Sequence, residues 1–356
     1  MAWSASLTSG SAPGEKTTFT PDTSAEGGYT VSSFTAPQKG VYRFELSGSG
    51  GTKGLAVIGN QDITTRKSYE QADGGEGGRT DGYLLLEKGQ TVYVGAGGTC
   101  SAAFVSGANG SSLAAIAKGD LLFVAGGGGA GGSFGESNDT TGYNCYATQG
   151  GDGGGSSGAE GEMDNLYPGG GGGTQSAGGQ PNGQYDGTTG GIGNAGAYGT
   201  GGARVSSTYE TYIAISGRGG DGLYGGGSGH SYAHWGTPYS ARGYGGGGGS
   251  GYVKTATLSV NSKTYTSETS QSGGAAPGTN GSVIVTLYAR SELPVRFDMA
   301  MVEQIIFNGT NVGSLIYNGT KVFMRRLRRC LRYPGGQSGC RAATRASFTS
   351  LSMACR

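Results

Sequence analysis

Cysteine and histidine are scarce in this chain of 356 residues, which contains five cysteines and two histidines. None of the cysteines stands in a Cys-x-x-Cys pair, so the sequence predicts neither a zinc site nor a disulfide framework. An odd number of cysteines without such a framework is typical of a reducing compartment. The cysteines are Cys100, Cys145, Cys330, Cys340 and Cys355.

Long apolar runs are missing too. No 18-residue apolar stretch exists, and the opening MAWSASLTSGSAPGEK lacks the apolar core of a signal peptide. We therefore expect no membrane span. We also expect a protein made in the cytoplasm, which would leave a cell by lysis or by another unaided route.

Neither sign of charge dominates, with 25 basic and 24 acidic residues. Eight Arg and no acidic residue lie between Met324 and Arg356, which leaves 17 basic and 24 acidic residues before that tail. A net-acidic body argues against nucleic acid as the main partner. The basic tail could contact nucleic acid or membrane, or it could be an out-of-frame translation product, and we favour no defined function for it.

Glycine is what the chain has in excess, at 79 residues, while apolar residues make up only 34%. Glycine has no side chain to bury, and it loses more backbone entropy on folding than any other residue. A core built from the apolar third alone would be thin for this length. Either much of the chain is disordered or the glycines themselves pack together.

Short segments rich in β-branched and aromatic residues, bounded by turn residues, predict an all-β fold. No window of a dozen residues has helical periodicity. Regularly spaced short strands favour a β-sandwich or jelly roll. The expected strands are Tyr29–Ala36, Val41–Leu46, Leu55–Ile58, Tyr83–Leu86, Thr91–Val94, Leu121–Ala125, Tyr252–Val260 and Ser282–Tyr288.

Between Gly126 and Gly251 the composition changes, since 47 of these 126 residues are glycine. Glycine runs can adopt polyproline-II helices, and without Cβ atoms several of these can lie at backbone distance and pair their N–H and C=O groups. The alternative is a disordered linker. We favour the packed bundle because predicted strands close over both ends. The longest runs are Gly126–Gly129, Gly169–Gly173 and Gly245–Gly249.

Several motifs, taken in order, resemble the glycine-rich domains of the anaplastic lymphoma kinase and leukocyte tyrosine kinase type. The resemblance spans about residues 30–290 and implies a tumour-necrosis-factor-like β-sandwich with an inserted bundle of polyglycine helices. In those receptors the module binds protein ligands, but this chain has no kinase domain and no membrane span. The motifs are Phe34–Pro37, Gly40–Phe44, Gly74–Gly78, Leu84–Gly95, Leu122–Gly131 and Gly245–Tyr252.

Near the C-terminus, Ile306–Val312 recurs ten residues later as Ile316–Val322, each copy with a central Asn-Gly. Asn-Gly between apolar residues predicts a β-hairpin, since both turn positions need positive φ. The pair is similar to short appendages that end tail and baseplate proteins of phages from gut bacteria. An ordinary pair of hairpins, silent on function, explains the pattern equally well.

These features divide the chain into four parts. We expect an N-terminal arm (1–28), a glycine-rich β-sandwich and polyglycine domain (29–290), a hairpin appendage (291–323) and a basic tail (324–356) that could be disordered.

Residues for catalysis are scarce. His230 and His234 have a spacing that suits a metal on a helix, but glycine-rich flanks disfavour a helix there. Ser133 matches the Gly-x-Ser-x-Gly motif without the helix that a nucleophile elbow requires. Glu160 and Glu162 have no apolar pocket to raise a pKa. We therefore predict no enzyme activity, no cofactor and no metal.

Recognition remains as the predicted role. Tyr, Ser, Gly and Asn dominate binding loops elsewhere, and Trp, Tyr and Arg most often dominate binding energy. We predict that loops projecting from the glycine bundle, chiefly Tyr224–Tyr244, contact a partner. The alternative is that these aromatic side chains cover the edges of the glycine lattice. The candidate residues are Tyr224, His230, Tyr232, His234, Trp235, Tyr239, Arg242 and Tyr244.

Two function classes follow from this sequence. The first is a phage tail or virion-associated adhesin, made in the host cytoplasm, whose partner is a host-surface glycan or protein receptor or another virion protein. The second is a bacterial cell-surface or secreted ligand-binding module. Either could be a homo-oligomer, and an enzyme is kept as a third hypothesis for testing.

Overall fold

A computed structural model describes residues 6–21, 29–58, 61–105, 112–136, 145–163, 168–181, 190–191, 193–209, 212–234, 240–271, 273–290, 306–307, 310–311, 314–317 and 320–324. Within these ranges the fold is built from β-strands, with short 3-10 turns and no α-helix, as the sequence predicted. None of the described segments is a helix long and apolar enough to cross a membrane. The chain divides into two units, residues 1–291 and 292–356.

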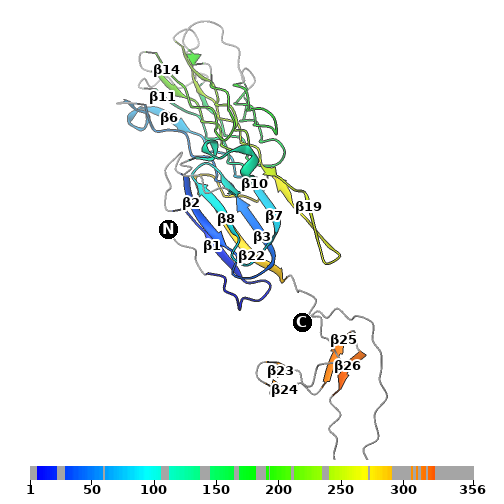
Figure 1. Cartoon of the computed structure of the whole chain (residues 1–356). Coiled ribbons are helices and arrows are strands. Elements are labelled where there is room, and N and C mark those ends of the chain that lie inside the picture. The colour runs from blue at the N-terminus through cyan, green and yellow to red at the C-terminus, as the bar shows by residue number, and fades with distance from the viewer. Residues whose placement is uncertain are drawn as a thin grey trace, which may run out of the picture. The chain divides into compact units, whose positions relative to one another are not determined.

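Two five-stranded antiparallel sheets form a β-sandwich in the first unit (Figure 1). The first sheet has the order β1 (Lys16–Phe19), β22 (Ser282–Arg290), β3 (Gly40–Ser47), β7 (Arg79–Leu86) and β21 (Glu268–Ser270). The second has the order β18 (Tyr252–Val253), β10 (Leu121–Ala125), β9 (Ser101–Phe104), β8 (Thr91–Gly97) and β2 (Tyr29–Thr35).

The main core lies between these sheets, because each strand turns alternate apolar side chains inward. In β3, Tyr42, Phe44 and Leu46 are fully buried while the intervening residues are half-buried. Phe44 packs against Phe123 of β10 with ring centroids 6.1 Å apart, which joins the two sheets. Aromatic side chains thus supply much of the apolar area that this glycine-rich chain can bury.

Strand β1 comes from the segment predicted as an N-terminal arm. It pairs with β22 along its whole length, and Phe19 is fully buried in the main core. The sequence analysis did not predict this strand. The arm's residues 16–19 therefore belong to the sandwich.

A second core covers the outer face of the second sheet, so that β10 is buried on both sides. The covering residues come from the 3-10 turn η2 (Leu113–Ala115) and from Leu223 in the glycine-rich region. A turn at η3 (Lys118–Asp120) then leads directly into β10. The glycine-rich region is thus fastened to the sandwich by apolar packing.

The described residues of the region 126–251 form seven strands that the sequence analysis did not predict. They join β6 (Ser68–Gln71) in two four-stranded sheets, which share a small core that includes Phe134, Ala233 and Ala241. One sheet has the order β14 (Ser206–Tyr209), β15 (Tyr212–Ile215), β11 (Ser133–Glu136) and β6; the other has β12 (Tyr146–Ala147), β17 (Ser240–Gly243), β16 (Ser231–His234) and β13 (Gly190–Gly191).

Glycine runs lie between these sheets and the sandwich and bond to one another through their backbones. Gly170 and Gly173 donate to the carbonyls of Gly245 and Gly248, each at 2.9 Å, and Gly249 donates to Gly127 at 2.9 Å. The three longest runs therefore lie side by side, as predicted, with 245–249 bonded to both others. We call this bonded set of glycine segments the glycine lattice; its polyproline-II geometry stays a prediction.

Two smaller hairpins lie outside these sheets among the described residues of the first unit, together with the turn η1 (Ile63–Thr65). In β19 (Thr257–Val260) and β20 (Lys263–Thr266) the turn residues Asn261 and Ser262 have φ of 50° and 62°, as a type I′ turn requires. The expected single strand Tyr252–Val260 is thus two strands, β18 and β19. β4 (Val57–Ile58) pairs with β5 (Gln61–Asp62).

Where the structure describes the second unit, it shows two hairpins, each formed by strands that flank an Asn-Gly pair. β23 (Ile306–Phe307) pairs with β24 (Thr310–Asn311), and β25 (Ser314–Tyr317) pairs with β26 (Thr320–Met324). The predicted hairpins are therefore present.

Candidate functional site

The predicted binding stretch Tyr224–Tyr244 is not one long loop. Strands β16 and β17 pair as an antiparallel hairpin in which Ala233 lies opposite Ala241 and His234 opposite Ser240. Trp235 and Tyr239, in the connection between the two strands, lie outside the described residues. Ala233 and Ala241 have small side chains, which lets the two four-stranded sheets pack closely against each other at this hairpin.

Three of the predicted contact residues are buried, which corrects their expected role. His230, Arg242 and Tyr244 are 2%, 4% and 0% exposed. The Tyr244 ring lies 6.2 Å from the His230 ring, and the Arg242 guanidinium lies over the Tyr146 ring at 5.4 Å. Because the flanking glycines let other segments approach at backbone distance, these side chains fill the space beside the lattice and cannot reach a partner. Tyr232 is half-buried.

Both ends of the β16–β17 hairpin are bonded into the lattice. Before β16, Gly229 donates to the Gly217 carbonyl at 3.0 Å. After β17, the Tyr244 N–H donates to the His230 carbonyl at 2.9 Å, and its carbonyl accepts from Gly217 at 2.8 Å. The hairpin is thus held at its base by a fixed framework, which is the arrangement that binding loops on rigid scaffolds share.

A thiol lies beside this hairpin but is not activated. Cys145 is half-buried, with Sγ 3.9 Å from a carboxylate oxygen of the buried Glu136. Burial raises the pKa of the Cys145 thiol, and the Glu136 carboxylate contributes to the shift. A nucleophilic cysteine needs the opposite shift. Among the described residues no group of three His, Cys, Asp or Glu side chains could hold a metal ion.

Ser133, which matched the nucleophile-elbow motif, lies inside strand β11 and is fully buried. Its hydroxyl donates to the Leu55 carbonyl at 2.8 Å. The Ser133 of the motif is thus part of a strand, whereas a nucleophile elbow places its serine in a sharp turn between a strand and a helix. Ser133 therefore fastens β11 to the segment before β4.

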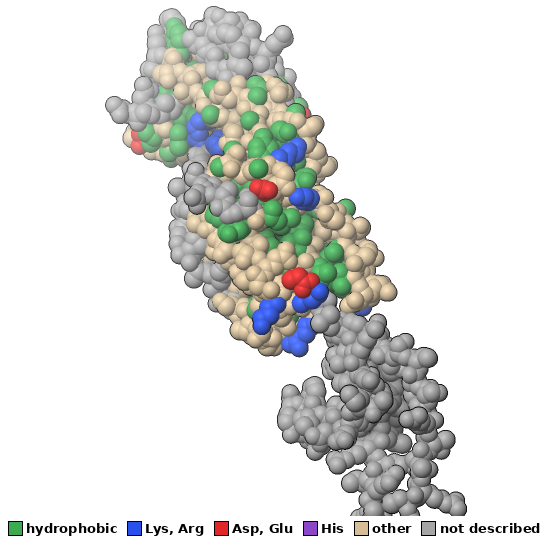
Figure 2. Space-filling model, in the orientation of Figure 1, with side chains coloured by type: hydrophobic (Ala, Val, Ile, Leu, Met, Phe, Trp, Pro, Cys, Tyr) green, Lys and Arg blue, Asp and Glu red, His purple; other side chains and the backbone are tan. Residues whose placement is uncertain are grey.

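Tyr224 lies on a different surface, which we call the tyrosine–lysine surface and define by Tyr198, Tyr224, Tyr252, Lys118 and Lys254. The three tyrosines are half-buried against the second core, and both lysines are exposed. The Tyr198 and Tyr224 rings meet edge to face with centroids 6.0 Å apart. Figure 2 shows hydrophobic and Lys or Arg side chains together where Figure 1 draws the 3-10 turns.

The sequence analysis missed four of these five residues. Tyr198 pairs with Tyr224 in an isolated β-bridge, while Lys118 comes from η3 and Tyr252 from β18. Nothing in the spacing of these residues along the chain indicates that they meet. Only the tyrosine content of the glycine-rich region was a signal.

Tyr198 supplies a prediction on pH. Burial, with Tyr224 and Asp120 adding to it, raises the pKa of Tyr198 from 10.0 to about 12. The unfolded chain then loses this proton at a lower pH than the folded protein. The contribution of Tyr198 to the free energy of unfolding is therefore complete below pH 10 and is lost as pH rises toward 12. We expect the free energy of unfolding, measured in urea, to fall more steeply over this range in the wild type than in Tyr198→Phe. Equal slopes would contradict the assignment.

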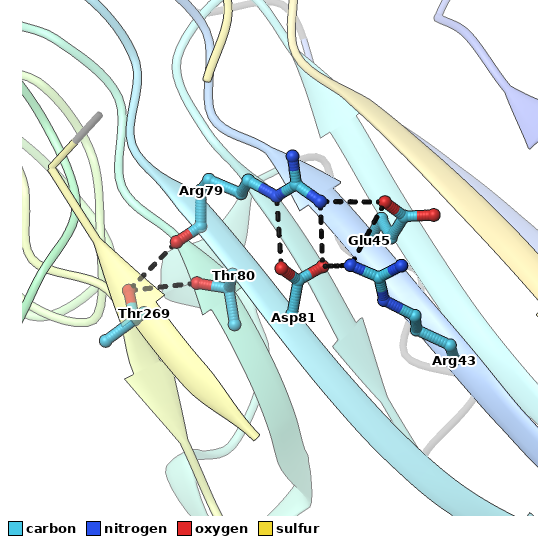
Figure 3. A network of polar contacts seen from close by, with 6 residues as sticks. All are labelled: Arg43, Glu45, Arg79, Thr80, Asp81 and Thr269. Atoms are coloured by element: carbon cyan, nitrogen blue, oxygen red, sulfur yellow. Dashed lines mark hydrogen bonds and ion pairs between the residues drawn. The ribbon is translucent and has the colours of Figure 1, made fainter. Parts of the chain in front are cut away.

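Four charged side chains on the outer face of the first sheet form ion pairs with one another (Figure 3). Arg79 binds Asp81 at 3.1 Å and Glu45 at 2.8 Å, and Arg43 binds Asp81 at 3.1 Å and Glu45 at 3.4 Å. The hydrogen bond to Asp81 raises the pKa of Arg79. With the two signs balanced and each partner engaged, this network offers no free charge to a ligand.

Comparison with known proteins finds no family model and no curated relative that matches the chain. The function is therefore argued from the geometry of this chain alone.

Proposed function

We propose that this protein is a non-catalytic binding protein, a phage tail or virion-associated adhesin that recognises a host surface. The observation that carries the proposal is the β16–β17 hairpin, whose base is bonded into the glycine lattice on both sides. Its connection, residues 235–239, includes Trp235 and Tyr239. The buried residues of the predicted stretch support this hairpin, and the connection is left as the part that meets the partner.

A rigid base matters for affinity. Ordering a mobile loop on binding costs free energy for each side chain that is immobilised, and a loop held in place avoids much of that cost. Trp and Tyr supply large amphipathic contact areas with few rotatable bonds. Such a connection suits a host-surface glycan or protein receptor.

The scaffold is proposed to be a jelly roll with polyglycine-II helices set into it. The two face-to-face five-stranded sheets and the hydrogen bonds between glycine runs support this assignment. In this arrangement the lattice is a spacer that holds the hairpin away from the sandwich. The short hairpins of the second unit are then the part that attaches to other virion proteins.

Replacing Trp235 and Tyr239 together with Ala tests the proposal. We expect adsorption of particles to host cells to fall about tenfold or more, since two aromatic anchors are removed from the contact. The circular dichroism spectrum and the amount of protein in purified particles should not change. Adsorption would be measured as the loss of free particles over time.

The matched control is Tyr69→Ala, which removes an aromatic side chain that is 50% exposed in strand β6. It should adsorb like the wild type. Wild-type adsorption by the double variant would contradict the role of the connection. Recovery of the protein with cell envelopes rather than with particles would favour a cell-surface module of the producing bacterium.

A further inference from the structure

The tyrosine–lysine surface is formed where three distant parts of the chain meet. Tyr198 and Tyr224 come from the glycine-rich region, Lys118 from η3, and Tyr252 and Lys254 from the end of the sandwich. All three tyrosines pack against the second core, which also contains Leu113, Ile116 and Leu223. The surface therefore has an apolar floor that belongs to the folded core, and its rings do not depend on a flexible loop.

The rings are held in fixed orientations. The Tyr198 hydroxyl donates to the Ile116 carbonyl at 2.7 Å, and its ring meets the Tyr224 ring at an interplanar angle of 76°. Each ring is half-buried, so that part of it faces solvent. The face of an aromatic ring carries partial negative charge and attracts groups with positive edges. The C–H groups on one side of a sugar ring are such groups.

One ammonium group lies over a tyrosine ring, and a second is bonded to the turn that carries the first. Lys118 Nζ lies 4.9 Å from the centroid of the Tyr224 ring and 3.5 Å from its hydroxyl. Lys254 Nζ donates to the Gly119 carbonyl at 2.6 Å. Gly119 directly follows Lys118 on an exposed turn, and a Cβ placed on it would meet no atom within 4 Å. The space above the turn is therefore open to a ligand.

The lysines keep donors available. An ammonium has three N–H donors, and Lys254 uses one of them on Gly119. Within the described part of the chain, the salt bridges involve other lysines and arginines. The half-buried Asp120 also lies close to Tyr198, where it adds to the effect of burial in raising the pKa of the Tyr198 hydroxyl. With two lysines and one aspartate, the surface is locally basic on a net-acidic body.

We propose that Tyr198, Tyr224 and Tyr252, with Lys118 and Lys254, bind an anionic sugar unit of a surface polysaccharide. The sugar ring packs on the exposed part of the tyrosines while its carboxylate or phosphate accepts from the two ammonium groups. A charge-assisted hydrogen bond is about twice as strong as a neutral one, so the acid selects among sugars that pack equally well. Two lysines on a net-acidic body can pair with one acidic sugar unit but not with the many successive phosphates of a nucleic acid backbone.

This inference rests on the proposed function, because it takes the host surface as the source of the sugar. It concerns a separate surface, so the two can fail separately. Loss of adsorption in the Trp235 and Tyr239 double variant concerns the hairpin connection alone. Binding of a purified oligosaccharide to the isolated full-length protein concerns the tyrosine–lysine surface alone.

The experiment measures binding of three oligosaccharides by calorimetry at low and high salt. The first is a short oligogalacturonate, the second is the same oligosaccharide with its carboxylates reduced to alcohols, and the third is a phosphorylated oligomannoside. We expect the protein to bind at least one acidic probe, more weakly at high salt, and to bind the reduced probe about tenfold more weakly or worse. Preference between the two acidic probes then identifies the acid as a carboxylate or a phosphate.

The variant K118Q/K254Q should bind the acidic probe about tenfold more weakly than the wild type, because both ammonium groups are lost. The lysines are exposed, so this variant is expected to fold. Lys88→Gln, which removes an exposed lysine in the turn between β7 and β8, is the control and should bind normally. No binding of either acidic probe, equal binding of the reduced probe, or unchanged binding by K118Q/K254Q would each overturn the proposal.

Discussion

Replacing Gly247 by Ala should unfold the glycine lattice, with a loss of at least about 3 kcal/mol in the free energy of unfolding. The Gly247 N–H donates to Gly227 and its carbonyl accepts from Gly220, both at 2.9 Å. A Cβ at this position would overlap the backbone of Gly171 on a third segment. Because the obstacle is backbone, no side chain can rotate away to make room.

The measurement is the urea midpoint and the melting temperature of Gly247→Ala against Gly10→Ala. Gly10 is exposed, and an added methyl group there would meet only the Thr8 hydroxyl, at 3.8 Å. Both variants lose the same glycine flexibility, so the difference between them isolates the lack of space in the lattice. A Gly247→Ala protein as stable as Gly10→Ala would show that the runs do not pack at backbone distance.

Tyr244→Ala should destabilise the protein by about 3–5 kcal/mol, the range for removing a large aromatic side chain from a core. Tyr244 is fully buried, beside His230 and within 3.5 Å of Arg242. Its removal leaves a cavity and takes a partner from the buried Arg242 guanidinium. Thermal unfolding followed by circular dichroism would measure the loss.

Tyr69→Ala is again the matched control, because it removes the same side chain from a site that is 50% exposed. It should change stability by less than about 1 kcal/mol. If Tyr244→Ala kept wild-type stability and lost only adsorption, the original interpretation of Tyr244 as a contact residue would be right. The full burial of Tyr244 argues instead for a loss of stability in Tyr244→Ala.

Strands of the sandwich could be predicted because their signal is local. Leu121–Ala125 was expected with the bounds that β10 has, and Val41–Leu46 lies within β3. Each combines β-branched and aromatic residues with flanking turn residues, which is enough to recognise a strand. The Asn-Gly hairpins of the second unit follow from equally local turn chemistry.

Strands inside the glycine-rich region could not be predicted in the same way. β15 shows no alternation of apolar and polar residues, because all four of its residues are buried, and it stands in a region whose composition is dominated by glycine. Its pairing with β11 places Ser133 opposite Ile215, far along the chain. β1 has the same difficulty, since its partner β22 lies at the other end of the unit.

The candidate site shows the same division. Density of aromatic residues singled out both Tyr224 and Tyr244, but it could not separate one from the other. Both residues precede a glycine run, yet Tyr224 is half-buried and Tyr244 is fully buried. Lys118 and Tyr252 carried no signal at all, because they come next to Tyr224 only through the packing of the second core.

The sequence by itself determined the β class of this protein and the mutual packing of its glycine runs. Every glycine lacks a Cβ, whatever its place in the fold. Where glycine runs are buried, their N–H and C=O groups must form hydrogen bonds, and the backbone of other runs supplies the partners. Only the tertiary structure decided which aromatic residues face solvent and which lysines stand beside them. Exposure depends on the segments that cover a residue, and in this fold the covering segments are brought together from distant parts of the chain.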